Sequence, residues 1–147
     1  MLDAEINERC FVDTNIWLYA FVEAQDRLKH SLAKAVVQRT GVVLSTQVVN
    51  ETCFNLLKKA NSSETEIQRL IASFYAKYKV VPTERFAMQK GSNLRKRYGF
   101  SYWDSLVVAC ALLAECTVLY SEDMQTGLRV EDQTTIVNPF SDALRPA

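Results

Sequence analysis

The sequence predicts an α/β fold in which helices cover both faces of a central parallel sheet. Short apolar segments rich in Val, Ile and Leu alternate with longer segments whose apolar residues recur at helical spacing. Parallel strands are joined by long crossovers, usually helices, so this alternation indicates repeated strand–helix units. The strands are expected at residues 9–13, 42–44, 80–82, 117–120 and 135–137.

Helices are expected between these strands, at residues 15–23, 27–39, 46–60, 64–78, 83–97 and 101–115. The helix over 46–60 carries Val49 and Cys53 on one apolar face, and Ser63-x-x-Glu66 fits a capping box before the next helix. The last helix is almost wholly apolar, so it should be central. Residues 121–130 are expected to form a loop with one helical turn at most.

The composition indicates a single domain over residues 1–147, with its core within about 9–140. The 17 Lys and Arg residues balance the 17 Asp and Glu residues, so the total charge does not decide whether nucleic acid is a partner. No apolar run approaches a membrane span, and the acidic first nine residues do not fit a signal peptide. A cytoplasmic protein without a membrane partner is therefore expected.

The cysteine and histidine content argues against two kinds of site. Cys10, Cys53, Cys110 and Cys116 form no C-x-x-C pair, and His30 is the only histidine. A structural zinc site is not expected from this set, and buried, reduced thiols are. A single histidine also makes a Ser–His–Asp triad a poor fit.

Four acidic residues are expected to gather at one edge of the sheet. Asp13 closes the first strand, and Glu51 lies in the helix after the second strand. Asp104 lies in the first turn of the apolar helix, and Asp123 follows the fourth strand. In open parallel sheets, ligands bind beyond the carboxyl ends of the strands. Carboxylates gathered there repel one another unless a cation neutralises them, and Mg²⁺ takes such oxygen ligands.

A metal–carboxylate site suits phosphodiester hydrolysis, because the ion activates a water molecule and stabilises charge on the phosphate. Each acid also has a structural interpretation that stays open. Asp13 could cap the following helix, and Ser101-x-x-Asp104 resembles a capping box. Glu51 could face solvent, and Asp123 could be an ordinary loop residue.

Four motifs resemble those of the PIN-domain family, in particular the VapC-type toxins of bacterial toxin–antitoxin pairs. In chain order they are Phe11-Val12-Asp13-Thr14-Asn15, the lone Glu51 in the helix after the second strand, Tyr102-Trp103-Asp104-Ser105-Leu106-Val107-Val108-Ala109-Cys110-Ala111, and Tyr120-Ser121-Glu122-Asp123-Met124-Gln125. Their order and separations make the resemblance fairly specific, and it spans about residues 9–140.

The resemblance implies a three-layer α/β/α sandwich and a ribonuclease that depends on Mg²⁺ or Mn²⁺. By position, Asp13, Asp104 and Asp123 would hold the metal, and Glu51 would bind metal or orient the attacking water. The family also implies an RNA substrate, a homodimer and a cognate antitoxin protein that holds the enzyme inactive.

Two further residues of the motifs are candidates for supporting roles. The resemblance implies that Thr14 helps to hold Asp13 or a metal-bound water. Glu122 is adjacent to Asp123, and either could face the metal. The Ser-x-Asp spacing of the fourth motif favours Asp123.

A basic run before the apolar helix is the expected RNA-binding surface. It comprises Arg85, Lys90, Arg95, Lys96 and Arg97, and the aromatic loop Tyr98-Gly99-Phe100 follows it. Cations paired with phosphates and aromatic rings stacked on bases would suit single-stranded or looped RNA. A solvated helix face is an equally open interpretation.

Two other functions stay open from the sequence alone. Asp13 could be phosphorylated, as in receiver- or phosphatase-like proteins, although Asn15 interrupts the D-x-D pattern of many phosphoaspartate hydrolases. The fold could also serve as a catalytically silent module that binds RNA or protein.

Overall fold

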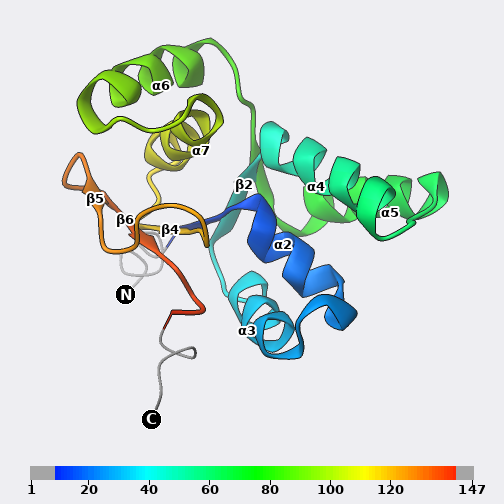
Figure 1. Ribbon diagram of the computed structural model, residues 1–147. Coiled ribbons are helices and arrows are strands. Elements are labelled where there is room, and N and C mark those ends of the chain that lie inside the picture. The colour runs from blue at the N-terminus through cyan, green and yellow to red at the C-terminus, as the bar shows by residue number, and fades with distance from the viewer. Residues whose placement is uncertain (1–8, 142–147) are drawn as a thin grey trace.

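The computed structural model describes residues 9–141 and shows a central sheet between two groups of helices (Figure 1). The strands are β1 Cys10–Val12, β2 Val42–Ser45, β3 Lys79–Val81, β4 Val118–Tyr120, β5 Arg129–Val130 and β6 Thr134–Val137. The helices are α2 Thr14–Phe21, α3 Arg27–Val37, α4 Thr46–Lys59, α5 Glu64–Lys77, α6 Arg85–Tyr98 and α7 Tyr102–Leu113, with the short 3-10 helix η1 Glu23–Gln25. Every expected strand and helix is present. The ends of the expected domain, residues 1–8 and 142–147, lie outside the described residues.

The sheet has the strand order β3-β2-β1-β4-β6-β5. β1 pairs in parallel with β2 and β4, and the pairs β2–β3 and β4–β6 are also parallel. The chain builds outward from β1 to β3 and then returns past β1 to β4. The strand order therefore reverses between β1 and β4, which is the position where open α/β sheets bind ligands.

The edge strand β5 departs from the expected all-parallel sheet. Residues 129–130, which were expected to belong to a loop, pair antiparallel with β6, so the expectation was wrong for these two residues, whereas residues 121–128 form a loop as expected. Gly127 has a φ of +89°, which lets the chain reverse direction, and its amide donates to the carbonyl oxygen of Ile136 at 2.7 Å. A two-residue strand is too short to produce a periodic sequence pattern.

The reversal of strand order also distributes the helices between the two faces. Right-handed crossovers place α2 to α5 on one face while the chain moves outward, and α6 and α7 on the other as it returns. Figure 1 shows α6 and α7 together on one side of the sheet and α2 to α5 on the other. The described residues thus form the expected α/β/α sandwich.

Helix α7 is central, as its apolar sequence predicts, because residues 105–112 are all buried. Helix α6 packs closely on it at Gly91, where an added Cβ would lie 3.0 Å from Leu106 Cδ2. On the opposite face Trp17 is fully buried, and its indole Nε1 donates to the carbonyl oxygen of Val12 at 3.0 Å. The Trp17 bond thus ties α2 to β1, and α2 and α7 both begin at the carboxyl edge of the sheet.

The four cysteines are buried and unpaired, as expected. Burial raises the pKa of each thiol, and that of Cys116 reaches about 12. Ser63 and Glu66 form the expected capping box at the start of α5. In residues 9–141, no helix has the length and apolar character needed to cross a bilayer.

Candidate active site

Asp13 lies at the carboxyl edge of the sheet, directly after β1 and beside the end of β4. Its backbone amide donates to the carbonyl oxygen of Tyr120 at 3.0 Å, which extends the pairing of the two strands by one residue. Asp13 is also the N-cap of α2. The capping role and a functional role are therefore compatible, because the cap places the carboxylate at the reversal of strand order.

The Asp13 carboxylate is held from two sides. Oδ1 accepts a hydrogen bond from the Thr14 backbone amide at 2.8 Å, and Oδ2 accepts one from the Ser121 hydroxyl at 3.0 Å. Burial nevertheless raises the pKa of Asp13 to about 6, and the negative charges of Asp104 and Glu51 add to the rise, while the two hydrogen bonds oppose it. The structure thus brings three of the four sequence-predicted acids within electrostatic reach of one another.

Glu51 reaches the same region from α4, and both of its oxygens have partners. Oε2 accepts from the Thr14 hydroxyl at 3.1 Å, and Oε1 accepts from Gln47 Nε2 at 2.6 Å. Thr14 therefore connects the two acids, because its amide holds Asp13 and its hydroxyl holds Glu51. The partly buried position of Glu51 differs from the open solvated interpretation.

Asp104 arrives from the opposite face of the sheet. Helix α7 precedes β4 and runs antiparallel to the strands, so its first turn lies at their carboxyl ends. Ser101 is the N-cap and its hydroxyl accepts from the Asp104 amide at 3.3 Å. Among residues 9–141, the Asp104 carboxylate completes no reciprocal capping bond, so the cap needs only Ser101.

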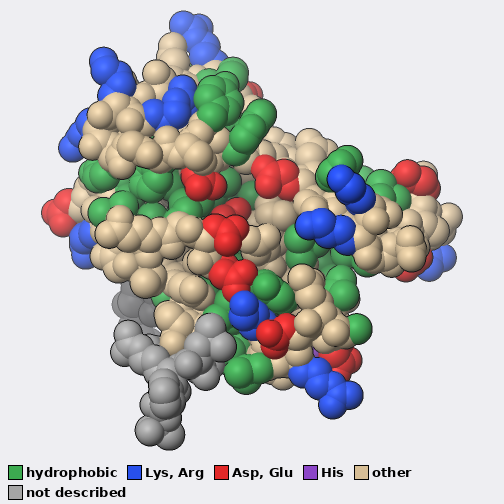
Figure 2. Space-filling view, viewed as in Figure 1, with side chains coloured by type: hydrophobic (Ala, Val, Ile, Leu, Met, Phe, Trp, Pro, Cys, Tyr) green, Lys and Arg blue, Asp and Glu red, His purple; other side chains and the backbone are tan. Residues whose placement is uncertain are grey.

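Asp123 shares an open pocket of about 240 Å³ with Asp104, lined also by Ser101 and Met124. Its side chain is exposed and accepts a hydrogen bond from Asn15 Nδ2. Asn15 follows Thr14 on the first turn of α2, so this bond ties the loop after β4 to the acids of α2 and α4. Figure 2 shows acidic side chains along the middle of this face, between α7 and the helices α2 and α4.

The acids supply the oxygen donors that Mg²⁺ or Mn²⁺ prefers, and the charges of Asp104 and Glu51 add to the effect of desolvation in raising the pKa of Asp13. Within the described part of the chain, however, no three Asp, Glu, His or Cys side chains surround a common point as the ligands of one ion do. Asp123 is turned toward Asn15, and Glu51 toward Thr14 and Gln47. The donor chemistry fits a hard cation, and binding it would require these side chains to exchange partners.

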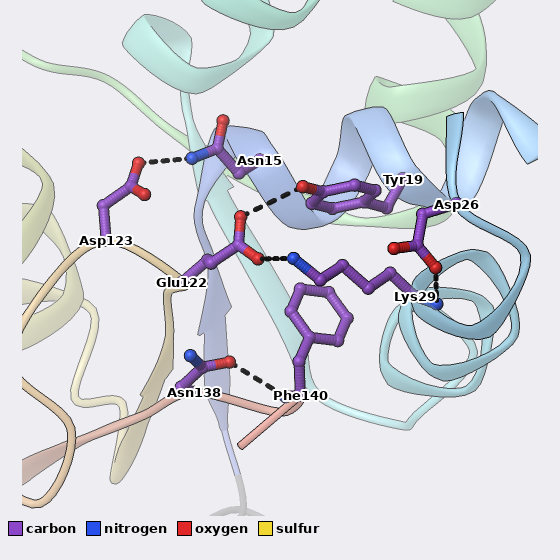
Figure 3. Close-up of polar contacts among 8 residues, drawn as sticks. All are labelled: Asn15, Tyr19, Asp26, Lys29, Glu122, Asp123, Asn138 and Phe140. Atoms are coloured by element: carbon purple, nitrogen blue, oxygen red, sulfur yellow. Dashed lines mark hydrogen bonds and ion pairs between the residues drawn. The ribbon is translucent and has the colours of Figure 1, made fainter. Parts of the chain in front are cut away.

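Glu122 points toward Tyr19 and Lys29, whereas the adjacent Asp123 points toward Asn15 (Figure 3). Glu122 forms an ion pair with Lys29 and accepts a hydrogen bond from the Tyr19 hydroxyl at 3.2 Å. The Lys29 ammonium also lies over the rings of Tyr19 and Phe140, at 5.1 and 5.4 Å from their centroids. Of the two adjacent candidates, the structure thus places Asp123 on the side of the acids and Glu122 in a contact between the loop, α2 and α3.

We expect Glu122→Gln to lower the free energy of unfolding by about 1 kcal/mol and to leave any nuclease activity within about threefold of wild type. The pair is more shielded than a surface salt bridge, because each side chain is only 19% exposed. Urea unfolding and RNA cleavage would be measured together. Loss of cleavage in Glu122→Gln, as severe as in Asp123→Asn, would contradict this assignment.

The basic run does not form one free surface. Lys90 Nζ lies 2.5 Å and Arg97 Nη1 3.6 Å from the carboxylate of Glu131, and Arg95 donates to the Ser105 hydroxyl at 2.7 Å. The remaining two members, Arg85 and Lys96, are exposed on α6, where Figure 2 shows Lys and Arg side chains. The charge pattern of the sequence did not reveal the partner Glu131.

Sequence reasoning gave no role to Ser121, Asn15 and Gln47, which hold Asp13, Asp123 and Glu51 respectively. Asn15 and Ser121 lie inside the first and fourth motifs, so the motifs marked these segments as functional without indicating which acid each residue contacts. Gln47 precedes Glu51 by one helical turn, and a Gln–Glu pair at this spacing is compatible with a hydrogen bond.

These features define a parallel α/β sandwich with carboxylates at its topological switch point, and a sequence-family model identifies the class. The PIN domain model matches residues 10–126, and the chain belongs to this family. A search of curated proteins found no match.

Solved structures with the same fold include VapC toxins. VapC20 of Mycobacterium tuberculosis, a toxin that cleaves the sarcin-ricin loop, has a TM-score of 0.63 and 20% identity, over 78% of this chain and 89% of that one. A toxin–antitoxin complex from Klebsiella pneumoniae has a TM-score of 0.66 and 17% identity, over 88% and 97%. VapBC2 of Rickettsia felis, bound to promoter DNA, has a TM-score of 0.59 and 16% identity, over 88% and 98%.

Proposed function

We propose that this protein is a metal-dependent endoribonuclease and the toxin of a toxin–antitoxin pair. The observation that carries the proposal is the partly buried Asp13 carboxylate at the switch point of the sheet, whose pKa is raised by desolvation and further by the charges of Asp104 and Glu51. Such a group is stabilised in its ionised form by a cation. Membership of the PIN family and the fold shared with VapC toxins support the same reading.

Asp13, Asp104 and Asp123 would hold a Mg²⁺ or Mn²⁺ ion, which supplies an activated water and stabilises charge on the phosphate. Thr14 and Ser121 hold the Asp13 carboxylate in one orientation, and Thr14 and Gln47 do the same for Glu51. Glu51 would accept a proton from the attacking water or contact the metal. Attack on phosphorus with the 3′-oxygen leaving gives a 5′-phosphate and a 3′-hydroxyl.

The partners proposed with this function are RNA, a second copy of the chain and a cognate antitoxin. Two of the similar structures are toxin–antitoxin complexes, which supports the last of these. An RNA substrate of this kind would be met in the cytoplasm.

The proposal is tested by incubating the purified protein with a mixed pool of small RNAs, with Mg²⁺, with Mn²⁺ and with EDTA. Cleavage is expected with either metal, and EDTA should remove it. Asp104→Asn, purified in the same way, controls for contaminating nucleases and should be inactive. The ends of the products should carry 5′-phosphates.

Cleavage that persists in EDTA or in Asp104→Asn would contradict the proposed site. A folded wild-type protein that binds RNA but never cuts it would favour the silent binding module instead.

A further inference from the structure

A second pocket adjoins the acids on the side of α4 and α7. It has a volume of about 580 Å³ and is lined by Thr46, Gln47, Asn50, Glu51, Thr83 and Trp103. The Thr83 amide donates to the Thr46 hydroxyl at 3.0 Å, which joins the start of α4 to the loop before α6. Glu51 belongs both to this pocket and to the acid cluster, so a ligand here would lie next to the proposed reaction centre.

Trp103, which lines this pocket, and its neighbour Tyr102 are both highly exposed. Trp103 is 63% exposed and Tyr102 52%, although they open the most deeply buried helix of the protein. Their rings meet edge to face, with centroids 5.1 Å apart. An exposed indole beside a pocket offers a flat apolar surface for stacking, which every nucleic-acid base can use.

Positive charge lies behind the aromatic pair. The Arg95 guanidinium is 4.5 Å from the centroid of the Tyr102 ring and donates to the Ser105 hydroxyl at 2.7 Å. These contacts hold the Arg95 side chain at the N-terminal end of α7. A backbone phosphate that follows a base stacked on Trp103 would find a cation there.

Polar groups suited to a base edge come from α4. Gln47 Nε2 faces the Glu51 carboxylate at 2.6 Å and lies 3.4 Å from the Trp103 carbonyl oxygen. Because a carboxylate only accepts hydrogen bonds, this orientation of the amide is fixed. Gln47 Oε1 is then left buried, and within residues 9–141 it accepts no hydrogen bond. A buried acceptor without a partner is unfavourable, so a donor from a bound ligand would stabilise it.

We propose that this pocket binds one unpaired base of the RNA next to the cleaved phosphodiester. The base stacks on Trp103, and its N–H groups face the amides of Gln47 and Asn50 while Arg95 pairs with the adjoining phosphate. This inference rests on the proposed ribonuclease function and adds the position at which one base of the substrate is bound. In a paired helix the base faces are covered by their neighbours and are not free to stack on a side chain.

The test measures binding of short, fluorescein-labelled RNA oligomers without self-pairing, and of a matched duplex, by anisotropy in Ca²⁺ buffer. The integrity of each oligomer is checked on a gel. Trp103→Ala should weaken binding of the unpaired oligomers roughly 5- to 100-fold, which corresponds to the loss of one base–aromatic stack. Trp103→Phe keeps a ring and should stay within about threefold of wild type. Binding of the duplex should not change.

Two controls separate stacking from general damage. Tyr75→Ala removes a ring that is 55% exposed on α5, outside this pocket, and should bind the oligomers as wild type does. Intrinsic fluorescence supplies an independent readout, because Trp17 is fully buried and Trp103 is accessible. Unpaired RNA should protect Trp103 from quenching by acrylamide.

Gln47→Met preserves the length of the side chain and removes the amide. It should reduce the differences in affinity among oligomers of A, C, G and U. Equal affinities for all four in the wild-type protein would overturn the role of Gln47 in recognising the base.

The two proposals fail in different ways. Binding that depends on Trp103 in a protein that never cleaves RNA would support the pocket and overturn the nuclease. Metal-dependent cleavage with unchanged oligomer binding in Trp103→Ala would support the nuclease and overturn the pocket.

Discussion

Asp13→Asn is expected to abolish RNA cleavage and, at the same time, to make the protein more stable at neutral pH. Even the partners that orient metal ligands change affinity or activity by about 10- to 100-fold when mutated. Loss of a ligand itself should therefore lower the cleavage rate by more than about 100-fold. The Asn side chain can still cap α2 and contact Ser121, so the fold should survive.

The gain in stability follows from the raised pKa of Asp13. Burial moves it from an ordinary value of 3.8 to about 6, so the ionised carboxylate is less favourable in the folded protein than in the unfolded chain. One pKa unit corresponds to about 1.4 kcal/mol. Removing the charge should therefore raise the free energy of unfolding by up to about 3 kcal/mol above pH 7.

The difference in free energy of unfolding between Asp13→Asn and wild type should depend on pH. Below about pH 3 the carboxyl is mostly protonated in both states, so wild type and Asp13→Asn should be equally stable. As the pH rises from about 4 to 6, the unfolded chain releases the proton first and the wild-type protein loses stability relative to the variant. Above pH 6 the difference should be constant.

Urea unfolding between pH 4 and 8, in EDTA, measures the effect. Asp123→Asn is the matched control, because its side chain is exposed and should bring no comparable gain. An Asp13→Asn protein that is active, or that is no more stable than wild type at pH 8, would contradict the role given to the buried charge.

The position of Asp13 could be predicted from sequence because two local signals coincide there. A short apolar strand ends at the same residue that starts a helix, and chain order alone then places that point at the carboxyl edge of a parallel sheet. Asp104 and Glu51 follow from the same topology, since a helix that joins parallel strands begins at this edge. These inferences need no knowledge of side-chain contacts.

The choice between Glu122 and Asp123 needed the structure. Glu122 is turned away from the acids by Lys29, which is 93 residues distant in the sequence. No local sequence pattern predicts a contact between residues so far apart. The side chains of a loop also follow no regular period, so their directions cannot be predicted from residue spacing. The same limit applies to Lys90, whose partner Glu131 is 41 residues away. From the sequence alone, more cations of the basic run are therefore expected to be free for RNA phosphates than the structure leaves free.

Among residues 9–141, hydrogen bonds account for the separate orientations of the acids, which do not surround a common point. Thr14, Asn15 and Gln47 donate to the carboxylates of Glu51 and Asp123, and such charge-assisted bonds stabilise the ionised groups. A cation would have to compete with these contacts, and in return it would offset the desolvation and the neighbouring negative charges that raise the pKa of Asp13. Metal binding should therefore be measurable as stabilisation, without any reference to catalysis.

We expect Mn²⁺ or Mg²⁺ to raise the free energy of unfolding of the wild-type protein by about 2.7 kcal/mol at a concentration of 100 times the dissociation constant. For a domain of this size that corresponds to an increase in Tm of about 5–10 °C. Asp13→Asn should show little of this increase, because it lacks the ionised carboxylate. Glu122→Gln should respond as wild type does.

The metal response should depend on pH in the same direction as the gain in stability of Asp13→Asn, since both require the Asp13 carboxylate of the wild-type protein to be ionised. A proton and a cation compete for the Asp13 carboxylate, whose pKa is about 6, so the stabilisation by metal should fade as the pH drops below 6. At high pH, Asp13→Asn is more stable than wild type because it lacks the charge of the carboxylate. The wild-type protein becomes more stable at high pH only when a metal ion neutralises that charge. The stabilisation by the substitution and the stabilisation by metal should therefore not add. Thermal melts at pH 5 and pH 7.5, with metal and with EDTA, measure this coupling. Equal metal responses in wild type and Asp13→Asn would show that the cation binds elsewhere.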